Sequence, residues 1–259
     1  MKISVITATF NSAATIAECV DSIAAQDHGD VEHVVVDGQS TDGTLEVLDE
    51  RRDSIAQLVS EPDEGIYDAL NKGIGLATGD VVGFLHADDV LADSSVLSWV
   101  ADAFEDDDVD GVYGDLQYVS ATDTSRVIRH WRSGEFSPRK LRWGWMPPHP
   151  TLYVRREWYQ WLGGLDTGYR IAADYHSILR LLSEPGFKVR YIPRVLVRMR
   201  VGGASNRSLR NIILKSREDF RALRATRAGA LGGFGALAWK NLSKLNQFVH
   251  ARSARRLTD

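Results

Sequence analysis

The feature that most constrains the fold is a regular alternation of short β-like runs and helix-like runs over the first hundred residues. ISVITATF at 3–10 precedes SAATIAECVDSIAAQ at 12–26, and VEHVVVD at 31–37 precedes TLEVLDERRD at 44–53. Strands joined by helical crossovers form parallel sheets, and near-continuous Val, Ile and Leu in the strands fits burial on both faces. The sequence therefore predicts an α/β fold with a mostly parallel sheet flanked by helices.

The pattern loosens after about residue 110. GVYGDLQYVS at 111–120 and SRVIRHWR at 125–132 are expected to extend the sheet, and helix-like and strand-like runs continue to about residue 204. A helix is predicted within the remaining segment, 205–259. The chain is thus divided into a first half at 1–110, a second half at 111–204 and a tail.

Composition places the chain among ordinary globular proteins, since 44% of its 259 residues are hydrophobic and 25% are charged. Its one cysteine, Cys19, excludes an intramolecular disulfide and fits a reducing compartment. No run approaches the ~20 apolar residues of a membrane-spanning helix, and no secretory signal is evident. A cytoplasmic location is expected.

The net charge of −4 conceals an asymmetry between the body and the tail. From Ser205 onward there are 12 Lys and Arg against 3 Asp and Glu, whereas the rest of the chain has 19 against 32. An acidic body with a basic tail suggests that the two regions meet different partners.

Four of the predicted strands end in polar residues. In an open parallel sheet, ligands bind outside the carboxyl ends of the strands, so these four segments should meet at one edge. The segments are Thr7-Ala8-Thr9-Phe10-Asn11, Asp37-Gly38-Gln39-Ser40, Ser60-Glu61-Pro62-Asp63 and His86-Ala87-Asp88-Asp89.

Asp88 and Asp89 are adjacent carboxylates at the end of a buried strand. Carboxylates there are suitable ligands for Mg²⁺ or Mn²⁺, which commonly bridge a diphosphate. The cation would cancel the repulsion between the two charges and stabilise a diphosphate leaving group. The alternative is a solvated turn, or an N-cap for the helix that starts near Ser94.

Two further acidic stretches flank the same edge. In DGQSTDGT, Asp37 is the better candidate for a ligand contact, and the stretch is not the GxGxxG of a dinucleotide-binding fold. In SEPDEGIYDALNKG, Lys72 could bind a diphosphate, or it could pair with Asp68 within one helix.

Several ordered motifs resemble one enzyme family. They are TATFNSAATIAECVDSIAAQ, VVVDGQSTDGT, EPDEGIYDALNKGIGLATGDVVGFLHADD and HPTLYVRREWYQWLGGLDTGYRIAADYHSILRL. The sequence resembles the inverting glycosyltransferases of family 2, in particular the bacterial subgroup that builds surface polysaccharides and glycolipids. The resemblance implies an A-type glycosyltransferase fold, a UDP- or GDP-sugar donor and a divalent metal. It makes 1–110 the donor half and 111–204 the acceptor half.

Carried over onto this chain, the resemblance implies a donor site along the first strand ends. Thr7, Ala8, Thr9 and Asn11 would line the nucleoside pocket. Asp37 would hold the base or ribose, and Asp63 would lie beside the nucleotide.

The segment His86-Ala87-Asp88 stands in the place of the family's Asp-x-Asp metal motif. His86 replaces the first aspartate, so Asp88, together with Asp89, would bind the metal. His86 would ligate it, or would contact a phosphate or a metal ligand instead. A second departure is Asp37-Gly38-Gln39-Ser40, where the family often has Asp-Asp-Gly-Ser.

Asp174, in AADYH, matches the family's catalytic carboxylate. Inversion requires one group to accept the proton of the acceptor hydroxyl, and a positioned carboxylate can do so. The alternative is that Asp174 caps the helix that follows.

The loop RWGWMPPHPT holds the candidates for acceptor binding, Trp145 and His149. Aromatic faces pack against sugar rings and a histidine can bind a hydroxyl. The alternative is a packed loop held by its three prolines.

The basic tail offers an apolar and basic helix, SLRNIILKSREDFRALRATR, followed by AGALGGFGALAW. Such a segment can lie on an anionic membrane, which would suit an enzyme with a lipid-linked acceptor on the cytosolic face. The alternative is a helix that docks on the body. Nucleic acid is not expected as a partner, because the body is acidic and no recognition module is present.

The prediction from the sequence is an inverting glycosyltransferase that acts on a glycan or a lipid-linked acceptor. Two alternatives remain: a sugar-phosphate nucleotidyltransferase, and a non-catalytic scaffold or regulator that retains the fold. The first would need a glycine-rich, basic phosphate loop, which TATFNSAAT lacks.

Overall fold

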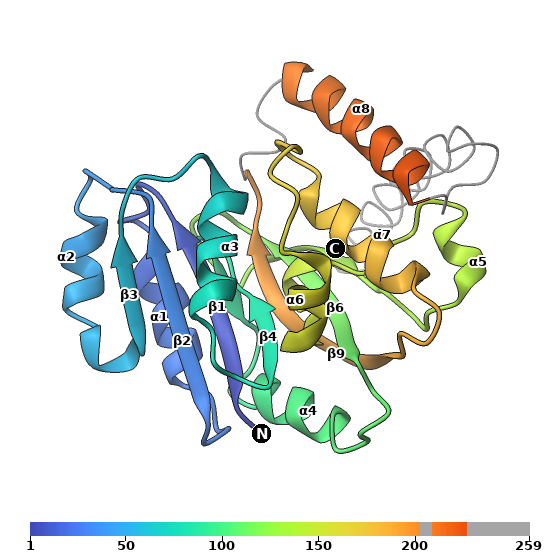
Figure 1. Cartoon of the computed structure of the whole chain (residues 1–259). Coiled ribbons are helices and arrows are strands. Elements are labelled where there is room, and N and C mark those ends of the chain that lie inside the picture. Colours follow the sequence, from blue (N-terminus) through green and yellow to red (C-terminus); the bar gives the residue numbers. More distant parts are fainter. Residues whose placement is uncertain (203–208, 227–259) are drawn as a thin grey trace, which may run out of the picture.

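The computed structural model describes residues 1–202 and 209–226, and its centre is one mixed sheet (Figure 1). The order along the sheet is β3-β2-β1-β4-β8-β6-β9-β5, with β7 paired to β6. The strands are β1 (Ile3–Thr9), β2 (Val31–Asp37), β3 (Gln57–Ser60), β4 (Val81–Phe84), β5 (Asp89–Leu91), β6 (Gly111–Val119), β7 (Val127–Trp131), β8 (Tyr153–Arg155) and β9 (Val189–Arg200).

Helices connect and cover these strands. They are α1 (Ile16–Ala24), α2 (Thr44–Asp49), α3 (Ile66–Leu76), α4 (Val96–Ala103), α5 (Pro138–Leu141), α6 (Arg156–Leu162), α7 (Ala173–Ser183) and α8 (Leu209–Ala225), with 3-10 turns η1 (Arg52–Ser54) and η2 (His149–Thr151). The alternation of strands and helices predicted for the first half is confirmed, and so is the α/β class.

The strands of the first half pair in parallel, and so do β6 and β9 of the second half. β1 pairs in parallel with both β2 and β4, and β2 with β3. The register places Thr9 beside Asp37 and Asp37 beside Ser60, so the polar strand ends lie along one edge as the sequence predicts. The antiparallel pairs all involve strands that follow β4, namely β4–β8, β6–β8, β6–β7 and β5–β9.

Both faces of the sheet are buried, and the alternation of side chains along β1 shows how. Ile6 and Ala8 belong to a core that includes residues of α3, α6 and α7, whereas Ile3 and Val5 belong to a core with α1, α2 and α4. The apolar stripe of each helix therefore covers one face, which explains the near-continuous apolar sequence of the strands.

A short strand after β4 is the clearest departure from the sequence-based expectation. The chain turns at His86–Asp88, enters β5 antiparallel to β9, and only then reaches α4, whose N-cap is Ser95. Asp89 is thereby placed in a strand, opposite Met199, and not in a solvated turn. A three-residue strand carries too little periodicity to be recognised beforehand.

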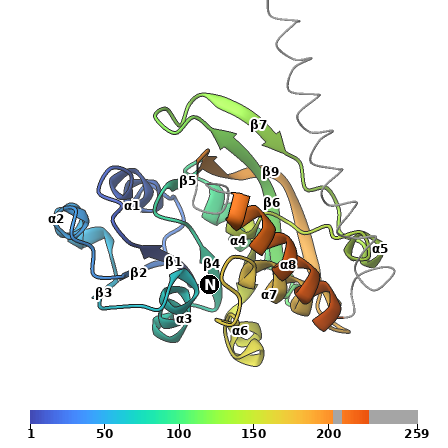
Figure 2. The ribbon, with the colours of Figure 1, turned by 90° about the horizontal axis from the view of Figure 1, so that it is seen from above.

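Helix α8 lies against α7 on the same side of the sheet (Figures 1 and 2). Its Ala222 and Leu223 are buried in the core that contains α7. The Arg221 guanidinium donates to the carbonyl of Gly168 (3.0 Å) and covers the ring of Tyr169 at 4.4 Å. For residues 209–226 the structure thus shows the docked alternative, while Ile213 of the same helix is 61% exposed.

None of the described helices is both long and apolar enough to cross a bilayer. The segment AGALGGFGALAW and most of the basic tail lie outside the described residues, as does the boundary at residue 204. Membrane attachment and the division of the chain therefore stay predictions.

Candidate active site

The loops that follow β1 and β2 are bound to each other. The amide of Asn11 donates to Oγ of Ser40 (2.8 Å), and Oδ1 of Asn11 accepts from the amide of Thr41 (2.9 Å). Asn11 has φ +49°, in the left-handed region that asparagine tolerates better than most residues. These polar residues of the edge thus hold its two loops together.

Asp37 is a buried carboxylate that links the ends of β2 and β3. Its carboxylate is fully buried, and it accepts hydrogen bonds from the amide of Ser40 (3.0 Å) and from the hydroxyls of Ser40 and Ser60 (2.5 and 2.7 Å). Two donors from Ser40, in the loop after β2, and one from Ser60, at the end of β3, hold this carboxylate. A base or ribose contact by Asp37 stays a prediction.

Asp63 lies directly over Gly38. Its Oδ1 accepts from the amide of Gly65 (2.8 Å), and a Cβ added at Gly38 would be only 2.4 Å from its Oδ2. The ring of Phe10 reaches the same point, at 3.4 Å, and is 61% exposed. A bare backbone flanked by a carboxylate and an exposed aromatic ring can receive a flat, polar group such as a nucleobase.

The other residues predicted for the nucleoside pocket are largely buried. Oγ1 of Thr7 lies 3.0 Å from Nε2 of His33, inside the core, so a ligand contact by Thr7 would come from its backbone. Ala8 and Thr9 are 7% and 4% exposed at the edge itself. Phe10 lies in the same loop but was not predicted as a binding residue, because the sequence does not show that its ring is exposed.

Lys72 is engaged with neighbouring acidic and carbonyl groups. Its ammonium lies 2.9 Å from Glu61 and 3.3 Å from Asp68, and it donates to the carbonyl of Pro62 (2.7 Å). The pairing with Asp68 that the sequence suggested is present. A diphosphate contact by Lys72 stays a prediction.

The two adjacent carboxylates after β4 lie in different surroundings. Asp88 is half-buried, and among the described residues its carboxylate has no hydrogen-bond or ion-pair partner. Asp89 is 1% exposed, accepts from the amide of Arg200 (3.2 Å), and has a pKa well above the usual range because of burial and the Asp88 charge. The turn itself is held by Arg200, whose guanidinium donates to the carbonyl of Asp88 (2.8 Å).

Asp174 lies in the first turn of α7 and does not cap it. The N-cap is Ala172, and no side-chain cap is present at that position. The Tyr67 hydroxyl from α3 donates to the carbonyl of Ile171 (2.7 Å) and lies 3.3 Å from Oδ1 of Asp174. Tyr67, which lies in the motif EPDEGIYDALNKG, is thus a candidate site residue that the sequence did not predict.

His86, just after β4, and His149, in η2, lie close to each other and to the charge of Asp174 in the first turn of α7. Their rings lie 6.1 Å apart, and His149 stacks on Phe84 at 5.0 Å. Burial lowers the pKa of His149 to about 4 and also lowers that of His86, while the charges of Asp174 and, for His86, Asp88 oppose this shift. His149 is therefore neutral at pH 7, and its buried Nε2 has no hydrogen-bond partner among the described residues.

Trp145 lies elsewhere, in an aromatic cluster. Its ring contacts Tyr113 edge-on at 5.7 Å and Phe136 at 5.8 Å, and its Nε1 donates to the carbonyl of Ser133 (3.3 Å). The structure thus supports the packed-loop alternative for Trp145 and places only His149 beside Asp174. Acceptor binding by either residue stays a prediction.

The donor set suits a metal that arrives with a diphosphate better than a cage made by the protein. In the described part of the chain, no three side chains of His, Cys, Asp or Glu are grouped as metal ligands. Mg²⁺ and similar ions are commonly held by one or two carboxylates plus substrate phosphates. The carboxylate of Asp88, unpaired within the described part of the chain, fits that role, and the buried Asp89 fits it less well.

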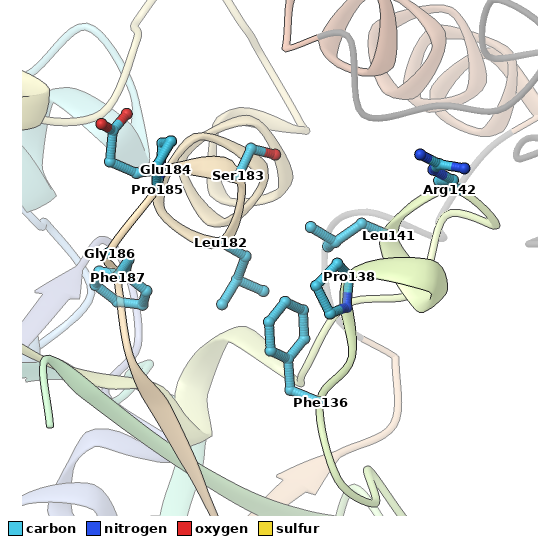
Figure 3. Close-up of a pocket in the computed structure, with 10 residues that line it drawn as sticks. All are labelled: Phe136, Pro138, Leu141, Arg142, Leu182, Ser183, Glu184, Pro185, Gly186 and Phe187. Carbon is cyan, nitrogen blue, oxygen red and sulfur yellow. The ribbon is translucent and has the colours of Figure 1, made fainter.

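A separate groove lies between α5 and the far end of α7 (Figure 3). Phe136, Leu141, Leu182 and Phe187 line it. Leu182 stands eight residues after Asp174 in α7, roughly 12 Å along the helix at ~1.5 Å per residue. The groove is therefore not part of the histidine and aspartate cluster.

Comparison with known proteins fits this geometry. Residues 4–171, more than half of the chain, match glycosyl transferase family 2. A PGL/p-HBAD biosynthesis glycosyltransferase of Mycobacterium tuberculosis is 36% identical over 209 residues, which cover 78% of each chain. An uncharacterized glycosyltransferase of Nostoc is 35% identical over 217 residues, 80% of this chain and 66% of that one.

Solved structures share the fold. A mannosyltransferase of Pyrobaculum calidifontis in complex with GDP-Man and Mn²⁺ aligns with a TM-score of 0.66 and 24% identity, over 100% of this chain and 76% of that one. Residues 1–349 of S. aureus TarS align with a TM-score of 0.65 and 20% identity, over 87% of this chain and 64% of that one.

The fold is thus that of the A-type glycosyltransferases. The chain belongs to glycosyltransferase family 2, and it is a glycosyltransferase.

Proposed function

We propose that this enzyme transfers a sugar from a UDP- or GDP-sugar to a hydroxyl of a glycan or lipid-linked acceptor, with inversion, in polysaccharide or glycolipid biosynthesis. The observation that carries the proposal is the convergence of His86 and Asp88, at the end of β4, with Asp174 and His149 from the second half of the chain. The 36% identity to a glycosyltransferase of PGL/p-HBAD biosynthesis supports the glycolipid assignment.

The donor nucleoside is assigned to the edge formed by Phe10, Gly38 and Asp63. Phe10 offers a face for stacking, Gly38 lets the base approach the backbone, and Asp63 offers carboxylate oxygens to N–H or ribose hydroxyl groups. Related folds have been solved with UDP-GlcNAc in TarS and with GDP-Man in the Pyrobaculum enzyme. Both nucleotides are therefore candidates for the donor.

The diphosphate is assigned to the turn after β4. Asp88 would hold a divalent metal, Mn²⁺ or Mg²⁺, and Arg200 fixes the backbone of the turn that carries Asp88. When bound, the metal supplies positive charge that stabilises the diphosphate as it departs. Mn²⁺ is present in the structure of the Pyrobaculum enzyme and in that of glucosyl-3-phosphoglycerate synthase of M. tuberculosis.

The chemical step is assigned to Asp174. Its carboxylate accepts the proton of the acceptor hydroxyl while that oxygen bonds to the anomeric carbon and the bond from this carbon to the diphosphate oxygen breaks. Attack on the face opposite the diphosphate inverts the anomeric centre. The Tyr67 hydroxyl beside Oδ1 fixes the carboxylate, and the neutral His149 places no positive charge near Asp174 that would weaken the carboxylate as a base.

Calorimetry with UDP-glucose, UDP-GlcNAc and GDP-mannose, each with and without Mn²⁺, tests the donor assignment. We expect one donor to bind with Mn²⁺ and Asp88→Asn to weaken that binding at least tenfold, because one carboxylate provides most of the protein's share of the site. Asp49→Asn, at the exposed end of α2, is the matched control and should bind as wild type.

The stereochemical outcome is tested by NMR of the sugar released from the same donor with water as the acceptor. An α-linked donor should yield the β-anomer first. Retention of the α-configuration would contradict inversion. Absence of binding to every donor under both metal conditions would favour the non-catalytic alternative.

A further inference from the structure

Helix α8 reaches the site through one buried carboxylate. Glu218 is 8% exposed and lies in α8, beyond the 4–171 segment that matches the family. Its carboxylate accepts hydrogen bonds from three successive backbone amides, those of Arg170 (2.9 Å), Ile171 (2.8 Å) and Ala172 (3.0 Å). These amides belong to the segment that leads into α7.

Glu218 thus binds the backbone just before α7 and at its N-cap. The amide of the N-cap, Ala172, is one of the helix N-terminal amides that have no partner within the helix and need an outside acceptor. Ala172, the N-cap of α7, has no side-chain oxygen and is itself buried. Glu218 supplies a negative charge there, where the helix dipole favours one, and charge-assisted bonds of this kind are about twice as strong as neutral ones.

The segment held by Glu218 is the one that positions the proposed base. The carbonyl of Ile171 accepts from the Tyr67 hydroxyl, and the same hydroxyl lies 3.3 Å from Oδ1 of Asp174. Glu218 is therefore connected to Asp174 in two ways. One is the backbone from Ala172 into α7, and the other is the hydrogen bond from the Tyr67 hydroxyl to the carbonyl of Ile171. A shift of the segment would move both.

We propose that Glu218 is a positioning residue for the transfer reaction: it holds residues 170–172 so that the Tyr67 hydroxyl and the Asp174 carboxylate keep their mutual geometry. The inference rests on the proposed role of Asp174 as the base. It assigns a role in catalysis to a helix that the sequence alone places in a basic tail.

The test compares Glu218→Gln with Leu223→Ala in the full-length protein. Glu218→Gln keeps the size of the side chain but removes the charge and turns an –NH₂ group toward backbone donors. Leu223, also in α8 and 1% exposed, contributes apolar burial to the docking of the helix, and its side chain has no atom that can hydrogen-bond to the segment. Leu223→Ala is therefore the matched control for weakened docking.

Two measurements separate positioning from docking. The first is amide hydrogen exchange of residues 170–172, which we expect to accelerate at least tenfold in Glu218→Gln and much less in Leu223→Ala. The second is release of UDP or GDP from UDP-glucose, UDP-GlcNAc and GDP-mannose with Mn²⁺ and water as acceptor. We expect Glu218→Gln to lower kcat about tenfold, to change the donor KM less than twofold and to shift the pH profile of kcat.

Tyr67→Phe provides a second route that does not depend on how well Glu218→Gln folds. It removes only the hydroxyl, and it should lower kcat and shift the pH profile in the same direction. Because both residues act through the same contacts, the double variant should lose much less than the product of the two single losses. Independent, multiplicative losses would overturn the proposal.

Equal effects of Glu218→Gln and Leu223→Ala on exchange and on kcat would also overturn it. Asp174→Asn in the same assay separates this failure from a failure of the proposed function. If Asp174→Asn releases nucleotide at the wild-type rate, the base assignment is wrong. If it is inactive while Glu218→Gln behaves like Leu223→Ala, only the positioning role is wrong.

Discussion

The donor edge and the base side of the site are built in different ways. At the donor edge, contacts join the ends of neighbouring parallel strands, as between Asp37 and Ser60, and the loops that follow them, as between Asn11 and Ser40. On the base side, the partners come from distant parts of the chain: Tyr67 meets Asp174 across 107 residues, and Glu218 meets Ala172 across 46.

This difference indicates that the donor edge and the base side can be altered separately by mutation. The edge of a parallel sheet places its loops side by side whatever lies beyond them. The base side depends on how α3, α7 and α8 pack. We therefore expect changes at the edge to act on donor binding and changes on the base side to act on the chemical step.

The largest expected effect is that of Asp174→Asn. Removal of a general base typically costs 10²- to 10⁴-fold in rate, and we expect kcat to fall by that order while donor affinity stays within about twofold. Nucleotide release and calorimetry measure the two quantities. Glu157→Gln, on the exposed surface of α6, is the control. If Asp174→Asn lost donor affinity as well as kcat, the assignment of donor binding to the edge and of chemistry to the base side would be contradicted.

Gly38→Ala should show the opposite pattern. The added Cβ would lie 2.4 Å from Oδ2 of Asp63, so this carboxylate must move or the loop must shift. We expect donor affinity to fall about tenfold, equal to about 1.4 kcal/mol, with kcat at saturating donor nearly unchanged. Gly29→Ala, where the Cβ would meet nothing within 4 Å, should bind donor as wild type. Unchanged affinity in Gly38→Ala would remove Gly38 from the donor site.

A third effect concerns stability and not activity, and it lies in the core beneath the donor edge. Burial lowers the pKa of His33 from 6.5 to about 3. The His33 imidazole therefore binds a proton more readily in the unfolded chain than in the folded one. Its neutral burial is compatible with full stability above pH 6.5, and the free energy of unfolding decreases as pH falls from 6.5 toward 3. Wild type should lose up to about 1.4 kcal/mol more per pH unit in this window than His33→Gln.

Urea unfolding between pH 7 and pH 4.5 measures that slope. Thr7→Val, which removes the hydroxyl beside His33 but keeps the imidazole, should retain the wild-type slope. Identical slopes for wild type and His33→Gln would show that the buried imidazole does not drive the acid sensitivity of this core.

Much of the donor edge was predictable because each strand end carries a local signal. Asp37, Asp63 and Asp88 were found as polar residues that follow apolar runs, and parallel pairing brings them to one edge. Their surroundings were not predictable. Asp88 and Asp89 are neighbours in sequence, yet pairing with β9 buries one carboxylate and leaves the other half-exposed.

By itself, the sequence determined the α/β class, the parallel pairing of the first strands and the location of Asp174 at a helix start, because these follow from hydrophobic period and from the motifs of the family. Only the tertiary structure decided that Ala172 is the N-cap of α7, that Tyr67 stands beside Asp174, and that Glu218 reaches the site. Such contacts arise from the packing of helices far apart in the chain, and no local pattern of residues records which side chains will meet there.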